Sequence, residues 1–208
     1  MDIERSSVQP AVSPVFVVGV PRSGTTWIMR MLAAHPEAWP LIETYLFSPY
    51  RGLGALLRTV PAEQGEPPAE DRDWVPAGLG RLFSREELVA ELRLLAERWL
   101  ALAAGSEARF LIEKSPGHLA VVEMIAEVLP RARFVHVVRD GRDVAVSLVA
   151  ARRSWSRFRE TVPRRTVREA AASWSVGMHE GRDARDAVGD RLLEVRYEEV
   201  HADPPAAV

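Results

Sequence analysis

Short apolar runs alternate with amphipathic stretches along most of this chain, and the first such pair is the clearest. The run Val15–Val18 is continuous, β-branched and closed by Gly19, which is typical of a strand buried on both faces. Residues 25–35 then carry apolar side chains at helical spacing until Pro36. The pattern predicts a strand, a glycine loop and a helix in succession.

The second half of the chain repeats this strand-to-helix pattern. Strands separated by helices favour a parallel sheet covered on both faces, so we predict an α/β fold of the P-loop-like, doubly wound type. Parallel strands end at one edge of such a sheet, where ligands bind. The elements predicted here are strands at 109–113, 133–138 and 192–196, and helices at 118–129, 142–153 and about 166–188.

Between these halves the pattern weakens. Residues 48–80 are rich in glycine, proline and clustered charges, which predicts a surface excursion with one short helix at 53–58. From Ser84 a capping box with Glu87 opens a helix that runs to Gly105. We expect one domain over 1–208, made of a first unit (14–47), a variable lid or substrate region (48–108) and a second half (109–204).

Composition narrows the possible partners. A formal net charge of -2 and a pI near 6.2 give no general attraction to nucleic acid or anionic membranes, so an anion site has to be local. The chain has no cysteine, which excludes disulfides and thiolate metal sites. The first residues lack the apolar stretch of a signal peptide, and no run is long enough to span a membrane. We therefore expect a cytoplasmic protein.

The loop after the first strand, residues 19–26, has the spacing of a P-loop, with threonine in place of the lysine. Glycines let backbone amides surround an anion, and the N-terminus of the next helix favours negative charge. An ordinary turn with a glycine is the alternative, but the strand before and the helix after favour a phosphate or sulfate site. Its candidate ligands are Arg22, Ser23, Gly24, Thr25 and Thr26.

Residues 21–38 resemble the 5′-phosphosulfate loop and first helix of sulfotransferases that use 3′-phosphoadenosine 5′-phosphosulfate (PAPS). The form of the loop is most similar to the tyrosylprotein and related bacterial branches. The resemblance implies PAPS as donor, adenosine 3′,5′-bisphosphate as product, and a place near the adenine for Trp27.

Two later segments carry the same resemblance. Residues 134–147 resemble the family's 3′-phosphate segment, which implies that Arg139 and Ser147 hold that phosphate. Residues 195–204 resemble a late segment whose tyrosine packs near the adenine, a role that falls on Tyr197. Taken alone, the first of these segments would be a solvated turn and the second a strand end followed by a turn.

Catalysis requires a base for the acceptor proton and cations for the developing charge. Glu43 matches the glutamate base of the tyrosylprotein branch, and His118 is the second candidate for this base. Lys114, the only lysine, matches a lysine that contacts the transferring group, and we assign it with Arg22 to charge stabilisation. No acidic cluster beside the loop has ligand spacing for Mg²⁺ or Zn²⁺, so no metal is expected.

The resemblance therefore predicts in-line sulfuryl transfer to a hydroxyl or amine, carried by a small molecule, a carbohydrate or a peptide tyrosine. Two other hypotheses stay open. One is a P-loop kinase or NTPase, and the other is a truncated PAPS-binding module without activity. The second arises because family members continue beyond Asp203-Pro204 with a segment that closes the nucleotide site, whereas this sequence stops at Val208.

Overall fold

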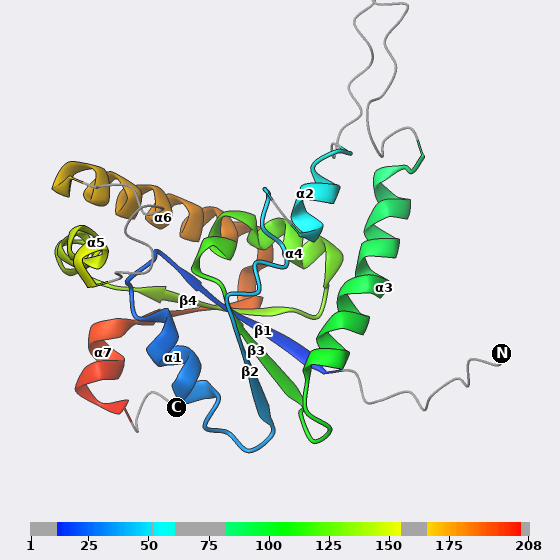
Figure 1. Cartoon of the computed structure of the whole chain (residues 1–208), viewed down its shortest axis with the longest axis horizontal. Helices are drawn as coiled ribbons and strands as arrows, with labels where there is room; N and C mark the ends of the chain where they lie inside the picture. The colour runs from blue at the N-terminus through cyan, green and yellow to red at the C-terminus, as the bar shows by residue number, and fades with distance from the viewer. Residues whose placement is uncertain (1–11, 51, 61–81, 155–165, 205–208) are drawn as a thin grey trace, which may run out of the picture.

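A single five-stranded sheet organises the molecule (Figure 1). The computed structural model describes residues 12–50, 52–60, 82–154 and 166–204. Every neighbouring pair of strands is parallel, and the strand order is β2-β3-β1-β4-β5. The strands are β1 (Ser13–Gly19), β2 (Ala38–Ile42), β3 (Phe110–Lys114), β4 (Arg133–Val138) and β5 (Leu192–Arg196).

Helices cover both faces of the sheet, which confirms the predicted doubly wound α/β fold. In the sheet, β2 lies on one side of β1 and β4 lies on the other side. Because the crossover connections are right-handed, the helix before β2 and the helices before β4 lie on opposite faces of the sheet. Helices α1 (Thr25–Leu32) and α7 (Tyr197–Ala202) lie on one face. The other face carries α2 (Leu53–Leu57), α3 (Arg85–Ala103), α4 (Val122–Val128) and α6 (Val167–Val188), and α5 (Gly141–Ser154) packs on α6.

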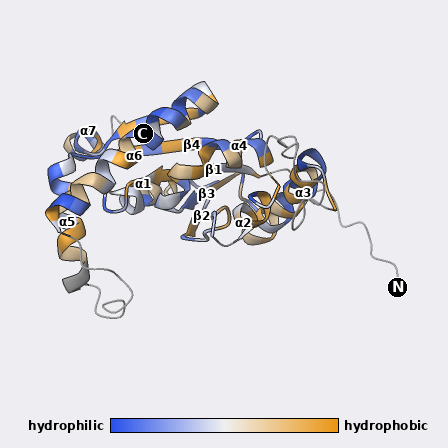
Figure 2. Ribbon diagram, turned by 90° about the horizontal axis from the view of Figure 1, so that it is seen from above, coloured by the Kyte–Doolittle hydropathy of each residue, from blue (hydrophilic) through white to orange (hydrophobic). Residues whose placement is uncertain are grey.

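Each face of the sheet has its own apolar core, because side chains alternate along the buried strands. Phe16 of β1 points into the larger core, where its ring stacks on Phe134 and meets Phe47 edge to face. Val17, the next residue, packs in the smaller core with Met29 of α1. Figure 2 shows β1 and β4 as largely hydrophobic strands.

The structure differs from the sequence prediction at two helices. The helix expected over 118–129 is divided into a 3-10 helix, η2 (Pro116–Val121), and α4, because the amide of His118 donates to the Ser115 carbonyl three residues back. The first helix ends at Leu32, since the amide of His35 closes a tight turn onto the Leu32 carbonyl. Both regions keep their predicted place between strands.

Other predicted features are present as expected. The Ser84–Glu87 capping box opens α3, and the short helix of the excursion is α2. The residues before Glu43 form the edge strand β2, a position in which Pro40 is tolerated. Residues 61–81, which include most of the glycine- and proline-rich excursion predicted at 48–80, lie outside the described residues. None of the described helices combines the length and the apolar character needed to cross a lipid bilayer.

Candidate active site

The sequence motifs meet at the carboxyl edge of the sheet. The glycine loop begins where β1 ends, Lys114 closes β3, and Arg139 follows β4. Glu43 and Tyr197 follow the ends of β2 and β5. This is the edge at which parallel α/β sheets bind ligands, so five distant segments contribute to one site.

The glycine loop is tightly curled before α1. Gly24 caps the helix with φ 97°, and the ring of Tyr197 lies against it where a β-carbon would be. Arg22 has φ 79°, a left-handed conformation that is uncommon for a residue with a side chain. Among the described residues, the buried hydroxyl of Ser23 has no hydrogen-bond partner. The loop therefore offers a buried donor as well as the amides of a helix N-terminus.

Arg22, Arg139 and Ser147 come together although they lie on separate segments. The Nε of Arg22 donates to the Ser147 hydroxyl at 2.9 Å, and Arg139 donates to the Arg22 carbonyl at 3.4 Å. The Nε of Arg139 is buried and, within the part of the chain that the structure describes, has no partner. Two guanidinium groups and a hydroxyl thus converge beside the loop, which is the donor set of an anion site.

An aromatic cluster borders this anion site. The rings of Trp27 and Tyr197 meet at 5.4 Å, and the Arg139 guanidinium lies 4.4 Å from the centre of the Tyr197 ring. His201 packs on both rings. Tyr197 opens helix α7, whereas a turn after the strand was the alternative interpretation of this segment. The structure brings Trp27 and Tyr197 together beside the phosphate candidates.

Glu43 and Lys114 form an ion pair across neighbouring strands. Lys114 Nζ lies 2.7 Å from Glu43 Oε1, and the Tyr45 hydroxyl donates to Oε2 of the same carboxylate. Lys114 is 3% exposed and Glu43 is 43% exposed, so the carboxylate is the solvent side of the pair. The hydrogen bond from Lys114 lowers the pKa of Glu43 below its ordinary value, although partial burial opposes this shift. Glu43 is therefore ionised near neutral pH.

His118, the second candidate base, is buried beneath this pair. Its Nε2 accepts a hydrogen bond from the Phe47 amide at 3.3 Å, which requires the proton to be on Nδ1. Nδ1 in turn donates to the Glu113 carboxylate at 3.1 Å. Both ring nitrogens are engaged, and the side chain is 1% exposed. This geometry favours Glu43 over His118 as the group that meets an acceptor.

The sequence reasoning did not single out Glu113, which accepts hydrogen bonds from Thr44, Ser115 and His118. Burial raises the pKa of Glu113, but the hydrogen bonds from His118 and from the two hydroxyl donors favour the ionised form, and the net shift lowers the pKa below its ordinary value. The available signal was a charged residue inside an otherwise apolar strand. Such a residue is rarely buried without partners.

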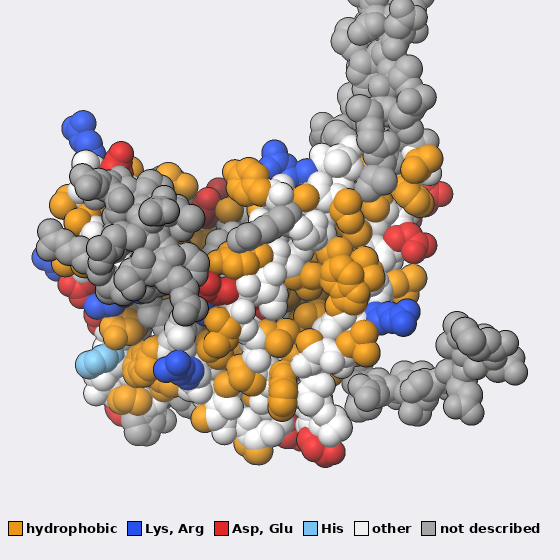
Figure 3. Space-filling view, in the orientation of Figure 1, with side chains coloured by type: hydrophobic (Ala, Val, Ile, Leu, Met, Phe, Trp, Pro, Cys, Tyr) orange, Lys and Arg blue, Asp and Glu red, His pale blue; other side chains and the backbone are white. Residues whose placement is uncertain are grey.

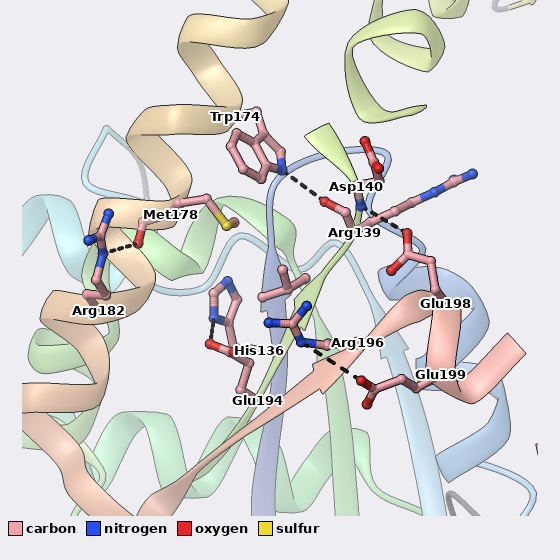
Figure 4. A pocket seen from close by; sticks show the side chains of 11 residues that line it. His136, Arg139, Asp140, Trp174, Met178, Arg182, Glu194, Arg196, Glu198 and Glu199 are labelled. Carbon is pink, nitrogen blue, oxygen red and sulfur yellow. Dashed lines mark hydrogen bonds and ion pairs between the residues drawn. The ribbon is translucent and has the colours of Figure 1, made fainter. Parts of the chain in front are cut away.

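A cavity of about 610 Å³ adjoins Arg139 between β4, β5 and α6 (Figure 4). The Trp174 indole donates to the Arg139 carbonyl at 3.0 Å, and a β-carbon on Gly141 would press on the same indole. The Asp140 amide donates to Glu198 of α7 at 2.9 Å. Sequence reasoning missed Trp174 and Glu198, which fix the turn that presents Arg139.

Charge on the surface is dispersed. On the face shown in Figure 3, basic side chains are scattered among acidic and apolar ones and form no continuous basic surface. Among the described residues, no group of three or more His, Asp or Glu side chains is placed to hold a metal ion. Basic side chains at this edge of the sheet include Arg22, Lys114 and Arg139, of which Lys114 is paired with Glu43 and Arg139 with Asp143.

The parallel sheet and its glycine loop define a P-loop-like α/β protein. Comparison with known proteins then identifies the family: the model of the sulfotransferase family matches residues 14–208, and the chain belongs to this family.

Relatives agree with this assignment. The chain is 25% identical over 195 residues to protein-tyrosine sulfotransferase 1 of Danio rerio, which covers 91% of this chain and 49% of the relative. It is 28% identical over 194 residues to the protein-tyrosine sulfotransferase of Drosophila melanogaster, covering 91% of this chain and 35% of the relative. The chain thus spans less than half the length of either relative.

The fold also matches solved structures. The sulfotransferase domain from the curacin biosynthetic pathway superposes with a TM-score of 0.59 at 16% identity, over 94% of this chain and 71% of that domain. At this identity the likeness shows the fold alone. The shared fold is the parallel α/β arrangement described above.

Proposed function

We propose that the chain transfers a sulfuryl group from PAPS to a hydroxyl or amine acceptor at the carboxyl edge of the sheet. The observation that carries this proposal is the Glu43–Lys114 pair, 2.7 Å apart, in which Lys114 lies opposite Val17 of β1, two residues before the glycine loop. A carboxylate can take the acceptor's proton, and an ammonium beside it can stabilise charge that develops on the leaving oxygen. Membership of the sulfotransferase family supports this reaction.

The residues around the loop fit an adenine nucleotide with phosphates at both the 3′ and 5′ positions. The buried Ser23 hydroxyl and Arg139 Nε have no partner among the described residues, and an anionic ligand would satisfy both. We assign the 5′-phosphosulfate to Ser23 and the neighbouring loop positions, and the 3′-phosphate to Arg139 and Ser147. The adenine is assigned to the aromatic pair. The loop positions that join Ser23 around the phosphosulfate are Gly24, Thr25 and Thr26, and the aromatic pair assigned to the adenine is Trp27 and Tyr197.

In the reaction, Glu43 takes the proton from the acceptor as the acceptor's oxygen or nitrogen bonds to sulfur. The bond between sulfur and the bridging phosphate oxygen breaks at the same time, and adenosine 3′,5′-bisphosphate leaves. Lys114 and Arg22 stabilise the charge left on the bridging oxygen. A sulfuryl group carries less charge than a phosphoryl group, so these cations and the loop amides suffice in this mechanism.

The ion pair also gives Lys114 a way to control the base. The hydrogen bond from Lys114 is the largest cause of the lowered pKa of Glu43. If Lys114 turns to the bound donor, that hydrogen bond is lost and the pKa of Glu43 rises. Glu43 then becomes a stronger base once the donor is bound, so that proton transfer is favoured when the donor is in place.

The acceptor is assigned only by chemical class. Glu43 is the exposed partner of its ion pair, and the Tyr45 hydroxyl already donates to it at 3.1 Å. The carboxylate is therefore open to a further hydroxyl from solvent. Two relatives are named protein-tyrosine sulfotransferases, which makes phenolic hydroxyls the first acceptors to test.

The test is transfer of ³⁵S from labelled PAPS to a panel of phenols, tyrosine peptides, alkyl hydroxyls, sugars and amines. We expect labelled product with at least one hydroxyl or amine class, and adenosine 3′,5′-bisphosphate in equal amount, without added metal. Binding of adenosine 3′,5′-bisphosphate without transfer to any acceptor would instead indicate a non-catalytic nucleotide-binding module. Affinity only for ATP with Mg²⁺ would indicate a kinase or NTPase.

A further inference from the structure

Glu113 is a fully buried carboxylate that takes four hydrogen bonds. Its Oε1 accepts from the Thr44 amide at 3.2 Å, the Thr44 hydroxyl at 2.8 Å and the Ser115 hydroxyl at 2.6 Å. Its Oε2 accepts from Nδ1 of His118 at 3.1 Å. A carboxylate has two oxygens that only accept, so every donor around Glu113 is matched.

These donors belong to the two segments that carry the ion pair. Thr44 directly follows Glu43, and Ser115 directly follows Lys114. The Ser115 hydroxyl also accepts from the Tyr45 amide at 3.3 Å, so it links the two segments to each other as well as to Glu113. Glu113 is thus the common acceptor for both sides of the proposed base and cation.

The segment after β2 needs such an anchor, because its backbone is in an unfavourable conformation. Glu43 has φ 51° and Tyr45 has φ 53°, both in the left-handed region that residues with side chains rarely adopt. Such conformations persist only where the surrounding structure holds them. The hydrogen bonds of Thr44 to Glu113 lie between these two residues in sequence and fix the backbone there.

An amide could not replace the carboxylate. Glutamine at position 113 would place its NH₂ group against either His118 Nδ1 or the Thr44 amide, so one N–H donor would face another donor. His118 cannot adapt by changing tautomer, because its Nε2 already accepts from the Phe47 amide. The network therefore depends on the charge of Glu113 as well as on its shape.

We propose that Glu113 is a positioning residue: it holds the segment 43–45 against the end of β3, so that the carboxylate of Glu43 meets Lys114. Glu113 does not touch the reacting atoms and acts through Thr44 and Ser115. Its effect on turnover rests on the proposed function, whereas its effect on the Glu43–Lys114 pair does not. The proposal can therefore be tested in the absence of any substrate.

The probe is Lys114 itself, which is the only lysine in the chain. Growth on lysine labelled with ¹³C at Cε gives one side-chain signal in a carbon–proton NMR spectrum. Glu43→Gln supplies the reference position of this signal for a Lys114 that has lost its carboxylate partner. We expect Thr44→Val and Glu113→Gln to move the signal from the wild-type position toward this reference.

Matched controls separate positioning from a general loss of packing or charge. Thr59→Val removes a threonine hydroxyl at the end of α2 whose bond goes to the Leu56 carbonyl, and Glu127→Gln removes a carboxylate that pairs with Arg85. Both controls should leave the Lys114 signal at the wild-type position. Thr44→Val is the decisive variant, because it changes no charge and only replaces one hydroxyl of the network with a methyl group of similar size.

A Lys114 signal that stays at the wild-type position in folded Thr44→Val overturns the proposal, even if Glu113→Gln fails to fold. In turnover assays, both variants should lower kcat by about 10²-fold, the usual cost of displacing a reacting group, and leave the affinity for adenosine 3′,5′-bisphosphate unchanged. If the wild-type chain transfers no sulfuryl group, the proposed function fails, but the NMR result still decides the role of Glu113.

Discussion

Glu43 and Lys114 are joined twice, once through the backbone and once through their side chains. The amide of Glu43 donates to the Lys114 carbonyl at 2.8 Å, and Lys114 Nζ lies 2.7 Å from Glu43 Oε1. In the parallel register, Ile42 of β2 is opposite Lys114 of β3. The pairing of two strands therefore places a carboxylate and an ammonium together although 71 residues separate them.

Glu43→Gln should abolish turnover because the amide cannot accept the acceptor's proton. We expect kcat to fall by about 10²–10⁴-fold, the range for loss of a general base, with the affinity for adenosine 3′,5′-bisphosphate nearly unchanged. Glu37→Gln, at the opposite end of β2 and paired with Arg109, is the control and should keep wild-type kcat. Wild-type turnover by Glu43→Gln would show that another group is the base.

Arg139→Ala should weaken binding of PAPS far more than binding of adenosine 5′-phosphosulfate, which lacks the 3′-phosphate. A hydrogen bond to a charged group contributes about 1.5–3 kcal/mol, which corresponds to about 10- to 100-fold in affinity. Arg142→Ala removes a nearby arginine whose side chain is 90% exposed, and it should change neither affinity. Equal losses for both nucleotides after Arg139→Ala would place the 3′-phosphate elsewhere.

Gly24→Ala should destabilise the loop. Gly24 has φ 97°, and an added methyl group would overlap the ring of Tyr197. The backbone conformation alone costs about 1–2 kcal/mol for a residue with a β-carbon, and nucleotide affinity should fall as Tyr197 is displaced. Gly117→Ala is the control, because no atom lies within 4 Å of its added methyl group. Urea unfolding of both variants measures the difference, and equal stability of the two would contradict this account.

The buried carboxylate of Glu113 should make stability depend on acid pH. Its pKa is lowered from 4.5 in the folded chain, so the unfolded chain binds the proton first as the pH falls. The stabilisation from ionised Glu113 is thus complete above pH 4.5 and is lost as the pH falls through the folded pKa. The difference in unfolding free energy between wild type and Glu113→Gln should therefore shrink below pH 4.5. A difference that is constant with pH would mean that folding does not shift the pKa of Glu113, and a difference that grows as the pH falls would mean that its pKa is raised in the fold.

The strands and the loop could be predicted from sequence because their signals are local. A continuous apolar run closed by glycine, such as Val15–Gly19, has few other structural solutions. The division of the helix after Lys114 could not be predicted, because it follows from a single backbone hydrogen bond of the 3-10 type, from the His118 amide to the Ser115 carbonyl. Periodicity reports which residues are apolar, and it gives no information on whether an amide donates three or four residues back.

The candidate site could be predicted only for residues whose type alone suggests a chemical role, such as basic side chains that follow a strand. Arg22, Lys114 and Arg139 stand next to strand ends, and the structure brings them to one edge as expected. The supporting residues Trp174 and Glu198 were missed, because each acts on a segment that is distant in sequence. Trp174 reaches Arg139 across 35 residues and Glu198 reaches Asp140 across 58 residues, distances over which sequence patterns carry no signal.

We propose that this sheet edge binds a nucleotide with a 3′-phosphate, and calorimetric titration measures such binding without any assumption about the acceptor. The chain would be titrated with adenosine 3′,5′-bisphosphate, with AMP, and with ATP in the presence of Mg²⁺. We expect tight binding of the bisphosphate without metal and much weaker binding of AMP, since only the bisphosphate engages Arg139 and Ser147. Equal affinity for AMP and the bisphosphate, or affinity for ATP with Mg²⁺ alone, would contradict it.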